Sequence, residues 1–179
     1  SPAVFSELPG MVGKMVGAGF LDDTRAREFV RRAKEHGETF FRTVEKDQTV
    51  HDMDQIYAWV CEQLGCELID DADTLFDRAE RVGWLPVKVA ERRGVIILNS
   101  DDEDVAHFAT TDPYDIMTRD WVERCAGKPS EFSVVLPSAH RETINRIRNE
   151  TVQGEDSGEV GVAVNITWEE EQRIGDTLE

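Results

Sequence analysis

The stretch LPVKVAERRGVIIL, residues 85–98, decides the fold, because it joins a short helix directly to an apolar run. Pro86 suits the first turn of a helix that runs to Arg92, and Gly94 suits its end. Residues 95–98 are apolar, rich in β-branched side chains and followed by a polar segment, which is typical of a buried strand. We therefore expect a sheet with packed helices in this part of the chain.

A hairpin and a second helix are predicted directly after this stretch. Polar residues 99–104 turn the chain, so that a second strand, residues 105–110, forms a hairpin with the first. Asp112 before Pro113 predicts a helix with its N-cap at Asp112, and Gly127 is suited to end that helix. We expect one face of it to carry the apolar side chains Tyr114, Met117, Trp121 and Cys125.

A third strand and a last helix complete this half. Residues 132–136 are a third β-rich run, and Ser138 is suited to cap a helix with Ile144 and Ile147 inward. The order helix, strand, strand, helix, strand, helix predicts a small mixed sheet with helices packed on it.

The first part of the chain, residues 8–65, is helical in its periodicity. A first helix ends near Gly17, Asp22 or Asp23 offers an N-cap for the second, and Gly37 is placed to end that one. The stripe expected to be buried on the second helix has the spacing i, i+3, i+4, i+7 and consists of Ala26, Phe29, Val30 and Ala33. Further helices are expected over residues 38–46, 52–64 and 75–81, the last within an acidic connector, residues 68–82.

These elements predict the α+β fold class, with a helical subdomain followed by a small mixed sheet. We place the helical subdomain at residues 1–67, the α/β subdomain at 68–150 and an acidic tail at 151–179. In the tail, Val160, Val162, Val164, Ile166 and Trp168 alternate with period two. Two interpretations stay open for this segment, an edge strand of the sheet or a linker.

Charge excludes several classes of function. The chain of 179 residues carries 37 acidic and 20 basic side chains, which gives a formal charge of −17. Such a surface disfavours general binding to nucleic acid or anionic lipid. The apolar run 94–98 is far shorter than the roughly 20 residues of a membrane span, and no signal-peptide pattern begins the chain. The odd number of cysteines, Cys61, Cys66 and Cys125, favours reduced thiols, so we expect a cytoplasmic protein.

One basic row stands out on this acidic chain. Arg27, Arg31 and Lys34 follow helical spacing on the predicted second helix, away from its apolar stripe. They are either a solvated helix face or a surface that docks a partner. We take these three residues as the candidate partner-binding residues.

No catalytic, cofactor-binding or metal-binding constellation is recognised in the sequence, so we expect no enzyme activity and no cofactor. The chain has no phosphate-binding GxxxxGK[ST], no GxSxG and no HExxH. A zinc site at Cys61 and Cys66 is disfavoured, because no second Cys or His pair follows them. The four histidines, His36, His51, His107 and His140, form no metal-ligand pair.

A family resemblance rests on three stretches, LPVKVAERRGVIIL at 85–98, VAHFATTDPYD at 105–115 and FSVVL at 132–136. They resemble the N-terminal domain of type II secretion and type IV pilus assembly ATPases. In that family a final helix ends near an Arg, which here is Arg146 or Arg148. The resemblance covers residues 8–150 and extends to the turns at Gly19 to Asp22 and Gln48 to Val50.

The resemblance implies an adaptor domain. In such secretion systems the domain precedes a hexameric motor and docks on the cytoplasmic part of an inner-membrane platform protein. It further implies a cytoplasmic protein that is peripheral to the inner membrane through its partner. A third interpretation is that the same domain is fused to an effector other than a motor.

Some members of the wider family bind cyclic di-GMP through a tandem pattern, Arg-Leu-Gly-x-x-Leu-Leu-x-x-Gly. Here Gly10, Met11 and Val12 stand in place of Arg-Leu-Gly, and Arg25 stands where a Gln is common. In the second copy Phe40 and Phe41 replace Leu-Gly, and Gln48 replaces the closing Gly. A cyclic di-GMP sensor is therefore the alternative function, with a degenerate motif.

Overall fold

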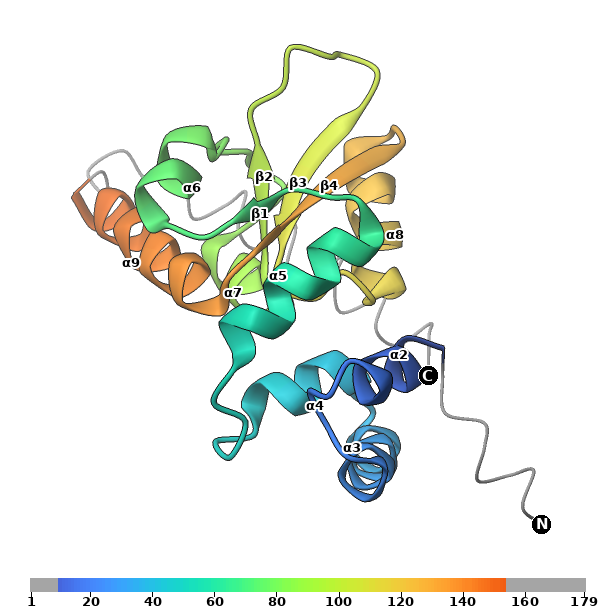
Figure 1. The fold of residues 1–179 in the computed structure, drawn as a ribbon. Helices are drawn as coiled ribbons and strands as arrows, with labels where there is room; N and C mark the ends of the chain where they lie inside the picture. The colour runs from blue at the N-terminus through green and yellow to red at the C-terminus, as the bar shows by residue number, and fades with distance from the viewer. Residues whose placement is uncertain (1–9, 154–179) are drawn as a thin grey trace. The chain divides into compact units, whose positions relative to one another are not determined.

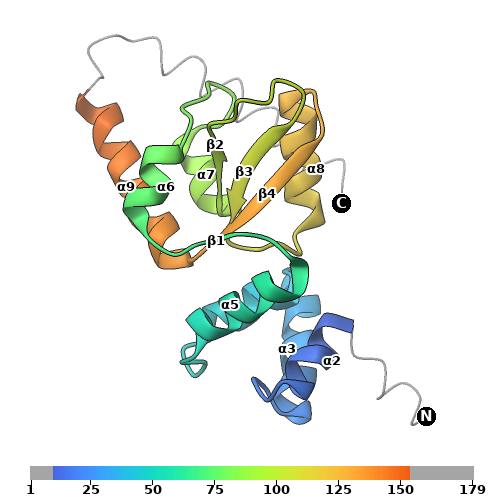
Figure 2. The same ribbon diagram turned by 45° about the horizontal axis from the view of Figure 1, so that its top comes forward.

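The computed structural model describes residues 10–153, and Figures 1 and 2 show the chain from two directions. The chain divides into two compact units, Ser1–Val60 and Cys61–Glu179. The division falls inside a helix, whereas the sequence placed the subdomain boundary after residue 67. The alternating segment of the tail, residues 160–168, for which an edge strand and a linker both stayed open, lies outside the described residues.

The first unit is helical, as predicted. It contains α2 (Gly10–Gly17), α3 (Asp23–His36), α4 (Phe40–Lys46) and most of α5 (Met53–Leu64). Aromatic rings contribute to its core, where Phe41 packs edge-on against Tyr57 at 4.9 Å between ring centroids. The fully buried side chains of this unit include Val12, Met15, Phe29, Phe41, Val44, Ile56 and Tyr57.

Local caps explain where α3 begins and ends. The Asp22 side chain accepts a hydrogen bond from the Arg25 main-chain N–H at 2.7 Å, and Gly37 follows the helix in the left-handed conformation. Both ends match the prediction. The next helix, α4, begins at Phe40 because Thr39 is its N-cap and accepts from the Arg42 N–H at 3.1 Å.

The second unit contains a four-stranded mixed sheet in the order β1-β4-β3-β2 (Figure 1). Its strands are β1 (Leu68–Ile69), β2 (Val95–Leu98), β3 (Ala106–Thr110) and β4 (Ser130–Val135). The predicted hairpin is confirmed, since β2 and β3 pair antiparallel with Ile97 opposite Phe108. The strand β4 runs parallel to both β3 and β1.

In the described part of this unit, the sheet is accompanied by α6 (Ala72–Arg78), α7 (Val87–Arg93), α8 (Ile116–Ala126) and α9 (Pro137–Gln153). The helices α6 and α9 lie side by side in both views. One core cluster joins α7 and α8 to the sheet and consists of Val89, Val95, Ile97, Phe108, Trp121 and Val122. The result is an α+β fold, as expected. Within residues 10–153, no helix has the length and apolar composition needed to cross a membrane.

The turn from α7 into β2 requires glycine at position 94. Gly94 has a φ of +65°, and a Cβ atom there would lie 2.1 Å from Thr111 Oγ1. The Thr111 N–H donates to the Gly94 carbonyl oxygen at 2.8 Å. The chain after β3 therefore packs directly on this turn, which fixes the end of the hairpin.

Several local predictions were wrong. The segment 68–82 contains β1, which the sequence analysis missed, and α6 begins at Ala72 rather than at residue 75. A strand of two residues has no readable periodicity, and the strand it pairs with in the described residues, β4, comes more than sixty residues later.

The start of α8 was also misplaced. Asp115, not Asp112, is its N-cap and accepts from the Thr118 N–H at 3.1 Å, while Asp112 accepts from the Tyr114 N–H in the preceding turn. Tyr114 consequently lies outside the helix, and Met117 is 52% exposed rather than inward. At the last helix, Ser138 is the second residue of α9 and not its cap.

Candidate interaction surface

The three predicted partner-binding residues all lie on α3. Arg31 and Lys34 are exposed and Arg27 is half-exposed, whereas Ala26, Phe29 and Ala33 of the same helix are buried. Val30, predicted to be buried with them, is only half-buried. The basic row is thus a continuous face of α3 that faces away from the core of its unit.

Acidic side chains of α3 pair with this row. Arg27 Nε lies 2.7 Å from Asp23 Oδ2, and Arg31 lies 2.5 Å from Glu35 and 3.7 Å from Glu28. The helix carries five Lys or Arg against three Asp or Glu, so it keeps an excess of positive charge on a chain of net charge −17. Exposed pairs of this kind contribute about 0–1 kcal/mol, so a partner can displace them at small cost.

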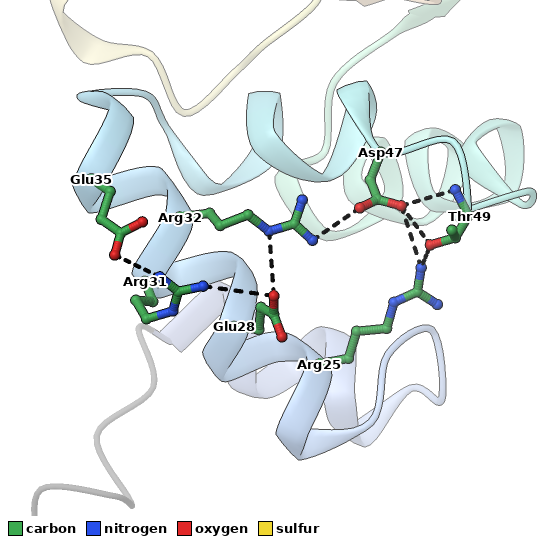
Figure 3. A network of polar contacts seen from close by, with 7 residues as sticks. All are labelled: Arg25, Glu28, Arg31, Arg32, Glu35, Asp47 and Thr49. Atoms are coloured by element: carbon green, nitrogen blue, oxygen red, sulfur yellow. Dashed lines mark hydrogen bonds and ion pairs between the residues drawn. The ribbon is translucent and has the colours of Figure 1, made fainter.

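A second polar cluster, which was not predicted, is formed by Asp47 with two arginines of α3 (Figure 3). Arg32 Nη2 lies 3.0 Å from Asp47 Oδ2, and Arg25 Nη2 lies 3.5 Å from Oδ1. Thr49 donates to Oδ1 through its main-chain N–H at 2.8 Å and its hydroxyl at 2.5 Å. The cluster fixes α3 to the turn after α4.

The hydrogen-bond donors around Asp47 determine the direction in which its pKa is shifted. The Asp47 side chain is only 12% exposed. Hydrogen bonds from Thr49, and then from Arg32 with its charge, lower the pKa of Asp47 from 3.8 to about 2, against the opposing effect of burial. The guanidinium groups of Arg32 and Arg25 also lie over the Phe29 ring, at 4.8 and 5.5 Å from its centroid. Arg25, which stands where the dinucleotide pattern has Gln, is therefore engaged within the unit.

The two positions where the pattern has the Gly of its Leu-Gly step lie in the core of the helical unit. Val12, where the pattern has its first Gly, is fully buried in α2. In the second copy, Phe41 is fully buried against Tyr57, and Phe40 packs edge-on against Phe29 at 6.2 Å. Side-chain volume thus occupies the places where glycine would let a ligand approach the main chain.

The two closing turns of the pattern differ in conformation. Gly19 has a φ of +86°, whereas no non-glycine residue in the described part of the chain, Gln48 included, has a positive φ. Asp47 builds the second turn instead, since it accepts hydrogen bonds from Thr49. The second copy therefore needs no glycine at position 48.

Polar contacts in the second unit connect its helices. Arg146 lies 2.7 Å from Asp73 of α6 and 2.9 Å from Glu142 of α9, and Arg148 pairs with Glu91 of α7. Both candidates for the Arg near the end of the last helix thus hold α9 to a neighbouring helix. Among residues 10–153, no group of three or more His, Cys, Asp or Glu side chains could hold a metal ion.

Comparison with known proteins places the chain in a family. A family model described as the MshEN domain matches residues 64–154, just over half of the chain. The chain belongs to the MshEN domain family. The matched residues run from the last residue of α5 through α9, so they cover the described sheet and its helices. A search of curated proteins finds no match to the chain.

Solved structures of MshEN-like domains share the fold. The N-terminal domain of XpsE is 23% identical with a TM-score of 0.60, over 75% of this chain and 91% of that one. A second crystal form of that domain is 21% identical with a TM-score of 0.53, over 76% and 93% of the two chains. The structure of MshE with cdg is 17% identical with a TM-score of 0.54, over 78% of this chain and 99% of that one.

The predicted resemblance to the N-terminal domains of type II secretion and pilus assembly ATPases is confirmed. The similarity is to the N-terminal domains of these ATPases and not to their catalytic part.

Proposed function

We propose that this MshEN domain is the non-catalytic interaction module of a bacterial secretion or pilus assembly ATPase-like protein. In this proposal it docks that protein on the cytoplasmic part of an inner-membrane platform component. The observation that carries the proposal is the family match over residues 64–154, joined to the fold shared with the N-terminal domain of XpsE. The domain would then work in the cytoplasm and reach the inner membrane through its partner.

The proposed contact surface is the face of α3 formed by Arg27, Arg31 and Lys34. The exposure of Arg31 and Lys34 supports this choice, because a partner with a complementary acidic surface can reach these side chains and displace their exposed intrahelical pairs. Displacing the exposed intrahelical ion pairs costs little free energy, about 0–1 kcal/mol for each pair.

A titration against the purified cytoplasmic region of the platform protein tests the proposal. We expect a dissociation constant tighter than about 100 μM, near the weak limit of useful recognition. Arg31→Glu should weaken binding by about fivefold or more, since a charge at the rim of an interface is reversed. Absence of binding at 100 μM would overturn docking, and unchanged affinity of Arg31→Glu would overturn the assignment of the α3 face.

The chain offers a matched control, Arg124→Glu. Arg124 on α8 is 55% exposed and pairs with Asp120 at 2.9 Å, four residues away. Arg31 is 58% exposed and pairs with Glu35 at 2.5 Å with the same spacing. Both variants change the net charge equally and break only exposed intrahelical pairs, one at Arg124 and two at Arg31, so a large difference in affinity reports on the contact surface.

The second candidate function is binding of cyclic di-GMP, which the structure of MshE with cdg favours. Against it stand the buried Val12 and Phe41 at positions where the pattern has glycine. Calorimetry with the dinucleotide should therefore show no binding heat at about 100 μM. Saturable heat with a micromolar dissociation constant would make the domain a nucleotide sensor instead. Sequencing the adjoining coding region would distinguish fusion to a motor from fusion to another effector.

A further inference from the structure

Cys61 and Cys66 lie at the two ends of one helix-terminating turn. Cys61 belongs to the last turn of α5, and Gly65 follows the helix with a φ of +66°. The Cys66 N–H donates to the Cys61 carbonyl oxygen at 3.1 Å. A left-handed glycine with this closing hydrogen bond is the Schellman motif, in which the side chains of these two positions commonly touch.

The same hydrogen bond limits the distance between the two residues. With standard backbone dimensions, an N–O distance of 3.1 Å keeps the two Cα atoms within about 7 Å of each other. That limit coincides with the upper end of the range in which a disulfide forms without backbone movement. Burial first, and then the charge and hydrogen bond of Cys66, raise the pKa of Cys61 to about 12, so the Cys61 thiol stays protonated and is not the first of the two to react.

We propose that Cys61 and Cys66 are a redox-modification site, a dithiol that closes to an intramolecular disulfide by exchange with a small-molecule disulfide. The two thiols have unequal access to solvent. Cys66 is half-exposed, whereas Cys61 is 5% exposed. Cys66 therefore reacts first with the external reagent, and Cys61 resolves the intermediate from inside the turn.

The exchange balances in two steps. The Cys66 thiolate attacks one sulfur of the small disulfide, which forms a mixed disulfide and releases one thiolate. The Cys61 sulfur, as it loses its proton, attacks the Cys66 sulfur, breaks the mixed bond and releases the second thiolate. The protein loses two thiol protons and two electrons, the reagent is reduced to two thiols, and the two protons end on the released sulfurs.

The position of the site gives the modification a structural consequence. Cys61 is the first residue of the second unit, and α5 spans the division between the units. A disulfide would close the turn covalently where the chain leaves α5 and enters β1. Oxidation would thus suppress fraying of the helix end at the junction of the two units.

The test uses the full chain in glutathione buffers of graded redox ratio. Samples are quenched with acid, unfolded, alkylated and analysed by peptide mass spectrometry. We expect one species lighter by two hydrogen atoms, with Cys61 joined to Cys66, in the unsubstituted chain and in the control Cys125→Ser. Cys61→Ser should stop at a mixed disulfide on Cys66, and Cys66→Ser should leave Cys61 as a thiol.

The same titration on the urea-unfolded chain shows how readily the two cysteines pair when only their spacing in the sequence brings them together. The difference from the folded chain is then the effect of the preformed turn. The folded chain should reach half-oxidation at a ratio of reduced to oxidised glutathione at least about tenfold more reducing. Equal midpoints would overturn the proposal, as would a stable glutathione adduct on Cys66 of the unsubstituted chain or pairing of Cys66 with Cys125.

Discussion

The two units of this domain differ in how they relate to their family. The MshEN match covers the described sheet and helices of the α/β unit, and its hairpin and the glycine-ended helix α7 are where the sequence predicted them. The helical unit lies outside the matched residues and has large buried side chains, Val12 and Phe41, where a dinucleotide-binding pattern has glycine. In the helical unit, side-chain volume at these two positions goes into packing of the core.

The largest loss of stability is expected from truncating one large buried side chain in each unit. Phe41→Ala removes a fully buried ring in the helical unit and should cost about 4 kcal/mol of unfolding free energy. Phe108→Ala is the matched change in the α/β unit, where the ring is 2% exposed. Amide hydrogen exchange should show each variant losing protection in its own unit. Equal loss across residues 10–153 in both variants would mean that the units unfold as one.

A smaller effect is expected at the turn between α7 and β2. Gly94→Ala should destabilise the α/β unit by about 3 kcal/mol, because left-handed strain adds to the contact with Thr111 Oγ1. Gly127→Ala is the control, since its φ is +71° and a Cβ there meets nothing within 4 Å. Thermal unfolding should separate the two variants, and equal losses would show that the Thr111 contact is relieved without cost.

Breaking the Asp47 cluster should lower the free energy of unfolding by less than the core truncations or Gly94→Ala do. Asp47→Asn removes the charge that pairs with Arg25 and Arg32, at a cost of about 2 kcal/mol to the helical unit. Because the folded pKa is lowered from 3.8 to about 2, the contribution is present above pH 4 and lost as the pH falls toward 2. Urea unfolding at pH 7 and pH 2.5 should show the difference between the two proteins shrinking. Asp101→Asn, in an exposed loop, is the control.

Much of the fold could be predicted because the residues that begin and end its helices act locally. Asp22, Gly37 and Gly94 act within a few residues of their own positions, so the ends of α3 and α7 can be read from the sequence. The helix start after β3 could not, because Asp112 and Asp115 both suit a cap and packing of the buried Asp112 decides between them. Likewise β1 could not be predicted, because this strand of two residues is recognised by its pairing with the distant β4 and not by a local pattern.

The candidate site was predicted only in part for the same reason. The row Arg27, Arg31 and Lys34 follows from helical spacing alone. The Asp47 cluster joins α3 to a turn more than ten residues beyond the helix, and nothing in the spacing of Arg25, Arg32 and Asp47 indicates that they meet. Only the Asp-x-Thr sequence at residues 47–49 is a local signal, because it favours a turn closed by the Asp side chain.

The most direct test of the central claim is to map where the platform protein binds. Backbone amide resonances of the full chain would be followed during titration with the cytoplasmic region of the platform component. The account predicts saturable shift changes centred on Arg27, Arg31 and Lys34 of α3. Changes confined to the α/β unit, or no change at about 100 μM partner, would contradict it.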